Sequence, residues 1–288
     1  MYDDILIPTD GSAVAERAFE AVLQLTNQRE STIHLLHVLD LGDIPSGIRE
    51  EVEGELTNRG EGVLEELAEA VSDEGFDVET TLESTIGSIH EQIVKYADSH
   101  GIDFIAMGTK RESALERFLV GSVTQQTLRD APAPVLTVNP DYQVGGSIDT
   151  ILHPNDGSEG AMAAAEHALT VSEELEATLH VVNVVDITGP WGTLDREYIM
   201  SAFEEAGQAA VDSVIERSKQ RDISSIQASV INGVPADAIL EYSSEQDIDL
   251  VVMGTHGRSG LRRALLGSVA EKVIGRSTVP VLTTNPDE

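Results

Sequence analysis

A glycine-rich stretch late in the chain, residues 254–268, has the residue types of a phosphate-binding loop. It holds three arginines and no acidic side chain, although the chain as a whole is strongly acidic. Glycines let a backbone approach a ligand closely. A helix beginning at Ser268 would direct its free N–H groups and its positive dipole end toward an anion. The stretch therefore predicts binding of a phosphate group, with a solvated glycine-rich turn as the alternative.

The corresponding stretch of the first half, residues 108–122, departs from this pattern. Arg111 stands where the second half has Gly257, and two arginines are replaced by Glu112 and Glu116. A side chain at position 111 would block close backbone approach, and the glutamates would repel a polyphosphate. We expect a weakened or lost site in the first half. The alternatives are that Arg111 itself binds phosphate or that a different ligand binds.

Histidine is the other residue type here that could hold a ligand. Two histidines take equivalent places in strand-like segments, where we expect packed or hydrogen-bonded side chains, and one lies inside the glycine-rich stretch. No two histidines have the spacing of a known metal site, and the chain has no cysteine. We therefore expect no metal ion held by side chains. The histidines considered are His34, His180, His256, His37 and His153.

The sequence is an internal repeat with a constant offset of 146 residues. Residues 5–12 return as 151–158, and residues 121–123 return as 267–269. A constant offset over most of the chain indicates a tandem duplication. We therefore predict a first domain over 1–141, a linker over 142–147 and a second domain over 148–288.

Each half alternates short apolar runs with amphipathic stretches, the pattern of a parallel sheet covered by helices on both faces. We predict two tandem, doubly wound, mainly parallel five-stranded α/β sheets flanked by helices. Ligands of such sheets bind beyond the carboxyl ends of the strands, where the winding reverses. In the first half we expect strands over Asp4–Thr9, Ile33–Leu39, Val78–Leu82, Phe104–Met107 and Val135–Val138, and helices over Ser12–Leu25, Glu50–Asp73, Ile86–Ser99 and Ser122–Asp130.

Two glycines three residues apart, followed after nine residues by Gly-Ser, resemble the nucleotide-binding signature of the universal stress protein family. The Pro-x-Asp after the first strand of the second half and the Val-Pro-Val-Leu run at 279–282 belong to the same resemblance, which covers nearly the whole chain twice. It implies an adenine-nucleotide alpha-hydrolase-like fold that binds ATP, with or without Mg²⁺. By this resemblance the nucleotide-binding residues are Pro154, Asn155, Asp156, Val184, Met253, Gly254, His256, Gly257, Arg258, Gly267, Ser268 and Val269.

The resemblance extends to the first half and to the way the halves associate. It implies that the two domains pair within the chain through their last strands, with Val135–Val138 facing Val281–Thr284. It leaves open whether two chains form a homodimer. The degenerate first site comprises Pro8, Thr9, Asp10, Val38, Met107, Gly108, Arg111, Gly121 and Ser122.

The charge balance bears on which partners the protein can bind and on the salt concentration to which it is adapted. With 51 acidic and 18 basic residues the formal charge is −33, which argues against nucleic acid as a partner. Self-repulsion at this charge is screened in molar salt, where the Debye length is ~3 Å. We expect a protein adapted to a salt-rich cytoplasm, with a merely acidic mesophilic protein as the alternative. The sequence contains no apolar run of the ~18 residues that a transmembrane helix needs, so we expect no membrane span. The acidic first residues do not resemble a signal peptide.

Three functions remain to be compared. The first is a regulatory stress-response protein whose ATP occupancy controls another component. The second is a scaffold or dimerisation protein without a ligand. The third is a slow ATP hydrolase, for which no catalytic residue can be assigned: a P-loop is absent, and residues 154–158 lack the glycine pair of the ATP pyrophosphatase loop. We expect the ATP-binding function, carried mainly by the second domain.

Overall fold

The computed structural model describes residues 2–26, 31–109, 120–186, 196–221, 223, 225–257 and 266–285. Strands and helices alternate along each half. The first half contains β1 (Asp4–Pro8), α1 (Ala13–Leu25), β2 (Thr32–Asp40), α2 (Arg49–Asp73), β3 (Asp77–Thr85), α3 (Ile89–His100), β4 (Phe104–Gly108), α4 (Ser122–Asp130) and β5 (Val135–Val138). The second contains β6 (Thr150–Pro154), α5 (Glu159–Glu174), β7 (Thr178–Val185), α6 (Arg196–Ser218), β8 (Ser225–Asn232), α7 (Pro235–Glu245), β9 (Leu250–Gly254), α8 (Ser268–Arg276) and β10 (Val281–Thr284).

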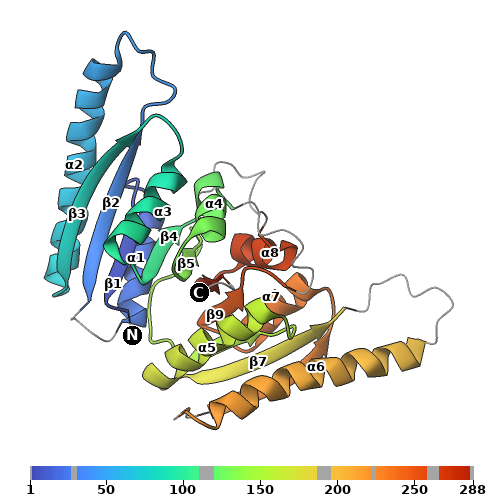
Figure 1. Ribbon diagram of the computed structural model, residues 1–288. Helices are drawn as coiled ribbons and strands as arrows, with labels where there is room; N and C mark the ends of the chain where they lie inside the picture. The colour runs from blue at the N-terminus through green and yellow to red at the C-terminus, as the bar shows by residue number, and fades with distance from the viewer. Residues whose placement is uncertain are drawn as a thin grey trace.

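The strands form one ten-stranded sheet in the order β3-β2-β1-β4-β5-β10-β9-β6-β7-β8. Pairing is parallel within each half and antiparallel between β5 and β10, where Leu136 lies opposite Leu282. These two leucines are equivalent residues of the repeat. The predicted α/β fold is confirmed, and the expected pairing of the last strands joins the two five-stranded sheets edge to edge (Figure 1).

Helices cover both faces of the sheet, and each face has its own hydrophobic core. Helices α1, α2, α5 and α6 pack on one face, and α3, α4, α7 and α8 pack on the other. Each core contains residues from both halves. The central strands β4 and β9 are buried along almost their whole length, which explains their uninterrupted apolar sequences.

The turns after β1 and β6 have the same construction. Gly11 and Gly157 have φ angles of +73° and +80°, in the left-handed region that favours glycine. The hydroxyls of Ser12 and Ser158 then accept the N–H groups of Ala15 and Ala161 and so cap α1 and α5. The helix expected from Ser12 is confirmed, with Ser12 as its N-cap residue.

Two elements of the first half, β3 and α3, differ from the expected bounds by more than one residue. Strand β3 is longer than predicted, because it lies at the sheet edge beside β2 and pairs with it as far as Thr85. The next helix was expected from Ile86 but starts at Ile89. The chain is still extended at Thr85, whose carbonyl accepts the N–H of Leu41, and Ser88 takes the N-cap position with an extended backbone. Within the described residues, no helix is long and apolar enough to cross a membrane.

Candidate functional site

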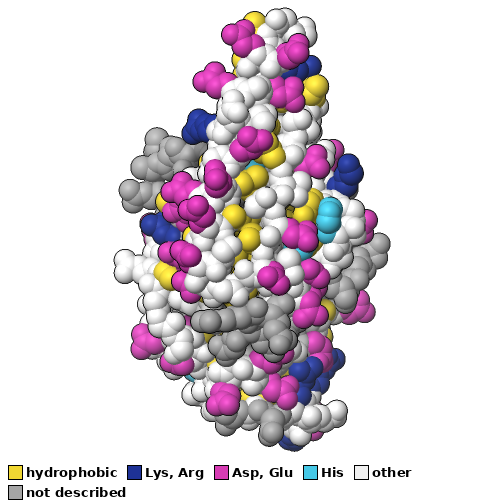
Figure 2. All heavy atoms as spheres, turned by 90° about the vertical axis from the view of Figure 1, so that its left-hand side faces the viewer, with side chains coloured by type: hydrophobic (Ala, Val, Ile, Leu, Met, Phe, Trp, Pro, Cys, Tyr) yellow, Lys and Arg dark blue, Asp and Glu magenta, His cyan; other side chains and the backbone are white. Residues whose placement is uncertain are grey.

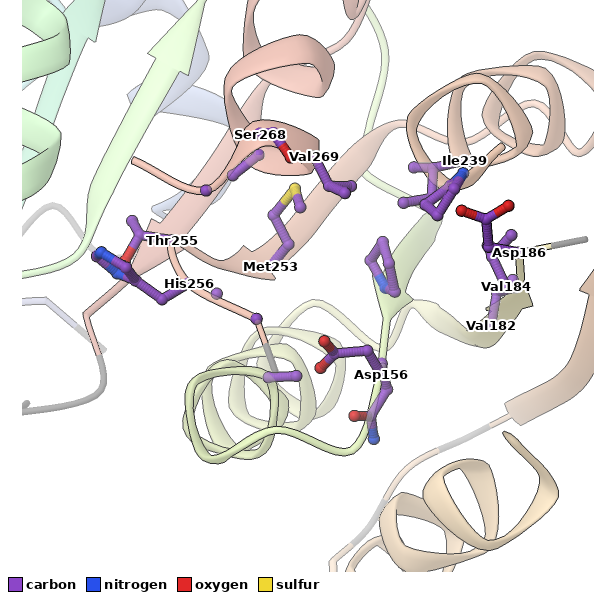
Figure 3. A pocket seen from close by; sticks show the side chains of 18 residues that line it. Asp156, Val182, Val184, Asp186, Ile239, Met253, Thr255, His256, Ser268 and Val269 are labelled. Carbon is purple, nitrogen blue, oxygen red and sulfur yellow. The ribbon is translucent and has the colours of Figure 1, made fainter. Parts of the chain in front are cut away.

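A cavity of about 470 Å³ lies in the second half, beyond the carboxyl ends of β6, β7 and β9. The first turns of α7 and α8 and the turn before α5 complete its wall (Figure 3). Strands β6 and β9 are neighbours, and the helices that follow β6 and β9 pack on opposite faces of the sheet. The cavity therefore occupies the winding reversal at which ligands of open α/β sheets bind.

The structure brings the predicted second-half residues together around this one cavity, apart from Arg258, which lies outside the described residues. That they bind a nucleotide stays a prediction. Those that line the cavity are Pro154, Asn155, Asp156, Val184, Met253, Gly254, His256, Gly257, Gly267, Ser268 and Val269.

Sequence reasoning missed several residues of the wall. Thr255 and Asp186 could have been found, because each directly follows the end of a strand that carries predicted residues. The residues from α7 had no signal, because only packing brings that helix to the strand ends. The missed residues are Ala161, Val182, Asp186, Pro235, Ile239, Thr255 and Ala270.

The loop after β6 is fixed by its own side chains. Asn155 is buried, and its Nδ2 donates to the carbonyl of Ala210 at 3.0 Å while its Oδ1 accepts the N–H of Gly157 at 2.8 Å. Asp156 Oδ1 accepts the N–H of Ser158 at 3.0 Å. These bonds hold the Asp156 carboxylate toward the cavity, as Figure 3 shows. A fixed carboxylate suits recognition of a polar group on a ligand.

The loop that leaves β9 returns to the same point at the start of α8. Thr255 donates its N–H to the carbonyl of Thr284 at 3.1 Å and accepts the N–H of Gly267 at 2.9 Å. A Cβ atom at position 267 would lie 2.8 Å from the Thr255 carbonyl oxygen, so only glycine fits without movement. The start of α8, at Gly267, Ser268 and Val269, therefore forms part of the cavity wall, and the first turn of a helix carries N–H groups without partners inside the helix.

The cavity has chemically distinct ends. One end is walled by the aliphatic side chains of Val182, Val184 and Ile239, with the Asp186 carboxylate beside them (Figure 3). The other is formed by the glycine backbone and Ser268, and the Asp156 carboxylate lies between the two ends (Figure 3). A mostly aliphatic slot beside a helix N-terminus suits a ligand with a flat ring and an acidic group. In the part of the chain that the structure describes, no three His, Asp or Glu side chains are grouped to hold a metal ion.

His153 lies in β6 directly before the site. Its side chain is fully buried, Nδ1 is 2.9 Å from the carbonyl oxygen of Val252, and Nε2 has no hydrogen-bond partner among the described residues. Burial lowers the pKa of His153 to about 4, so the imidazole is neutral. It supports the sheet and does not line the cavity.

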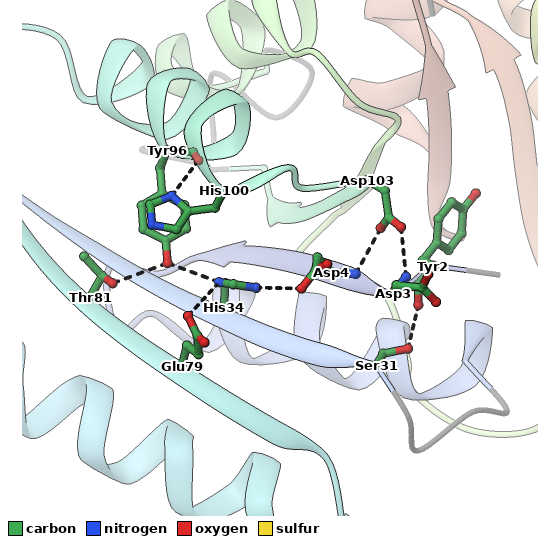
Figure 4. A network of polar contacts seen from close by, with 10 residues as sticks. All are labelled: Tyr2, Asp3, Asp4, Ser31, His34, Glu79, Thr81, Tyr96, His100 and Asp103. Carbon is green, nitrogen blue, oxygen red and sulfur yellow. Dashed lines mark hydrogen bonds and ion pairs between the residues drawn. The ribbon is translucent and has the colours of Figure 1, made fainter.

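The expectation of hydrogen-bonded histidines in the second strand of each half is confirmed. His34 lies between the Tyr96 hydroxyl, 3.1 Å from Nδ1, and Asp4, 3.1 Å from Nε2 (Figure 4). His180 contacts the Tyr242 hydroxyl at 3.0 Å, and burial lowers the pKa of His180. Both pairs tie a strand to the helix that covers it, α3 or α7.

The predicted first-half residues occupy equivalent places, apart from Arg111, which lies outside the described residues. Their surroundings differ: Val14 replaces Gly160, and its side chain packs closely on the backbone of Gly108. His37 replaces the buried Asn183, and burial lowers the pKa of His37. Pro8, Thr9 and Asp10 lie at or beyond the end of β1, Val38 lies in β2, Met107 and Gly108 end β4, and Gly121 and Ser122 begin α4.

Comparison with known proteins agrees with this two-domain α/β architecture. The model of the universal stress protein family matches residues 1–139 and 147–285, and the chain belongs to that family, with two such domains. Universal stress protein MJ0531 of Methanocaldococcus jannaschii is 37% identical over 140 aligned positions, in a match that covers 46% of this chain and 79% of the relative. Universal stress protein Slr1230 of Synechocystis is 24% identical over 306 aligned positions, gaps included, in a match that covers 97% of this chain and 99% of the relative.

A solved structure shows the same arrangement at full length. The crystal structure of a universal stress protein from Archaeoglobus fulgidus matches with a TM-score of 0.73 and 25% identity. The match covers 98% of this chain and 96% of that one. The tandem arrangement is therefore shared with another member of the family.

Proposed function

We propose that the second domain binds ATP, with or without Mg²⁺, and that its occupancy regulates another component of a stress response. The observation that carries the proposal is the single cavity that unites the Asp156 loop, an aliphatic wall and the glycine-bounded start of α8. Family membership supports the stress-response assignment. No catalytic residue is assigned.

The two ends of the cavity suggest how the ligand lies. The adenine ring fits the aliphatic end, at Val184 and Ile239, where its apolar faces would be buried. The phosphates fit the other end, at Gly257 and Ser268, where backbone N–H groups and a helix start stabilise negative charge. Asp156 lies between these ends and would accept a hydrogen bond from the nucleoside.

The proposal is tested by identifying the nucleotide that accompanies the protein. The chain is purified in molar KCl and denatured, the released small molecules are identified by mass spectrometry, and ATP, GTP and CTP are compared by titration of the stripped protein. We expect ATP to be released, to bind in preference to GTP and CTP, and to survive incubation without hydrolysis. Absence of any nucleotide binding by the folded protein would favour the scaffold function, and turnover of ATP would favour the hydrolase.

A further inference from the structure

Two asparagines, one directly after β5 and one directly after β10, each donate hydrogen bonds to the other domain. Asn139 follows β5, and its Nδ2 donates to the carbonyls of Ile274 at 2.6 Å and Ser277 at 2.9 Å, at the end of α8. Asn285 follows β10, and its Nδ2 donates to the carbonyl of Ala131 at 3.1 Å, at the end of α4. The repeat therefore places two reciprocal polar contacts across the domain interface.

Each asparagine also accepts a hydrogen bond from a threonine of its own domain, the residue directly after β4 or β9. The hydroxyl of Thr109 donates to Asn139 Oδ1 at 2.5 Å, and the hydroxyl of Thr255 donates to Asn285 Oδ1 at 2.8 Å. Thr255 lines the cavity, whereas Thr109 belongs to the first domain. In the second domain, Asn285 therefore connects the wall of the proposed nucleotide site to the first domain.

Counting donors and acceptors gives this connection a direction. The Thr255 hydroxyl has one hydrogen, and two acceptors face it: Asn285 Oδ1 at 2.8 Å and, farther away, the Thr284 carbonyl at 3.2 Å. Because both of these groups only accept, the Thr255 oxygen is left to accept the Nδ1–H of His256 at 2.9 Å. The amide of Asn285 then donates to Ala131. His256, Thr255, Asn285 and Ala131 thus form one continuous polar chain from the cavity wall to the end of α4, and we call it the cross-domain chain.

Thr255 is the point at which a displacement would reach the phosphate end of the site. Its N–H donates to the carbonyl of Thr284 in β10, and its carbonyl accepts the N–H of Gly267, so its backbone connects β10 to the start of α8. Ser268 follows Gly267 directly and begins α8. A shift of Thr255 would therefore move the helix start and its N–H groups relative to the Asp156 carboxylate.

We propose that Asn285 is a positioning residue, through which the first domain sets the ATP affinity of the second and through which ATP occupancy is transmitted to α4. This inference rests on the proposed ATP binding and specifies how it is regulated. Helix α4 starts at Ser122, at the equivalent site of the first domain. ATP binding in the second domain would thus alter α4, which borders the equivalent site of the first domain.

The first test measures the dissociation constant for ATP in wild type, Thr255→Val, Asn285→Asp and the matched control Thr109→Val. Valine removes the hydroxyl at nearly constant shape, and aspartate keeps the acceptor for Thr255 but removes the donor to Ala131. Working in molar KCl, where the Debye length is ~3 Å, limits the effect of the added charge to the groups in direct contact with it. Thermal melts confirm folding. We expect at least fivefold weaker binding in Thr255→Val and Asn285→Asp and less than twofold change in Thr109→Val.

The second test reports transmission directly, and its comparison of wild type with Asn285→Asp uses the variant whose folding the thermal melts confirm. Hydrogen exchange of the last turn of α4, residues 127–131, is measured with and without saturating ATP. We expect ATP to slow exchange there in wild type and to lose that effect in Asn285→Asp, which a merely stabilising role would not produce. Equal affinities in all four proteins, or exchange in α4 that ignores ATP, would overturn this inference alone. A wild type that binds no ATP would overturn the proposed function and this inference together.

Discussion

At the scale of single residues, Gly257 is the clearest difference between the two domains. A Cβ atom at position 257 would lie 2.8 Å from Asp156 Oδ2, closer than a carbon can approach without displacing the carboxylate. The first domain has Arg111 at this position. The identity of this residue therefore bears both on the space in the loop and on the placement of the carboxylate opposite it.

The substitution Gly257→Arg copies the first domain into the second. We expect it to weaken ATP binding at least tenfold, because the side chain displaces Asp156 from its place beside the ligand. Isothermal titration of both proteins in molar KCl measures the change. In the first domain, Arg111→Gly alone should restore little binding, because Glu112 and Glu116 remain. Unchanged affinity in Gly257→Arg would show that the phosphates do not bind beside position 257.

His153 gives stability a pH dependence whose sign can be worked out. Its folded pKa of about 4 lies below the ordinary histidine value of 6.5, so the unfolded state binds more protons between these values. Stability therefore falls as pH drops through this window, and one histidine shifted this far contributes about 2 kcal/mol between pH 7 and pH 5.

The substitution His153→Ile places the first-domain residue, Ile7, at the equivalent position. Urea unfolding at pH 7 and pH 5 should show a loss of stability that is smaller in His153→Ile by about 2 kcal/mol. Other titrating groups are common to both proteins and cancel in this comparison. An identical loss in both proteins would mean that His153 is not held neutral by burial.

At the scale of elements, much of the fold could be predicted from the sequence. Helix α4 and strand β5 have the predicted bounds, because apolar periodicity and turn residues decide them locally. The extent of β3 could not be predicted, because it depends on pairing with β2. The part of the cavity wall that α7 supplies was missed for a related reason: Pro235 and Ile239 reach the strand ends only through packing.

The β5–β10 junction makes a prediction of its own. Leu282 is fully buried in a core that contains residues from both halves. Leu282→Ala should therefore cost about 2–5 kcal/mol of unfolding free energy, whereas Ile48→Ala, at a position that is 51% exposed, should change it by less than about 0.5 kcal/mol. Urea denaturation measures both. Equal effects of the two substitutions would contradict the joined core.

At the scale of the whole molecule, the charge of −33 is spread over a surface with few compensating cations. Figure 2, which looks at the α2 and β3 side of Figure 1, shows acidic side chains distributed over that face with only scattered Lys and Arg. Local ion pairs do occur in the second domain, where Glu166 contacts both Arg217 and Arg221. Exposed pairs of this kind offset little of the general repulsion.

Salt should consequently stabilise the protein. Raising KCl from 0.1 M to 1 M shortens the Debye length from about 10 Å to about 3 Å, and we expect the thermal midpoint to rise by at least several degrees. Sucrose, which is uncharged, serves as the control for general exclusion effects. A midpoint that ignores KCl, or that responds equally to sucrose, would favour an ordinary acidic protein over a salt-adapted one.

The central claim is that one of the two repeated domains holds a nucleotide, and the number of ATP molecules bound per chain tests it most directly. Calorimetric titration of the stripped, full-length protein in molar KCl gives this number. The asymmetry between Gly257 and Arg111, and between Gly160 and Val14, predicts about one ATP per chain. Two ATP per chain would contradict the loss of the first site, and none would contradict the assignment of the cavity.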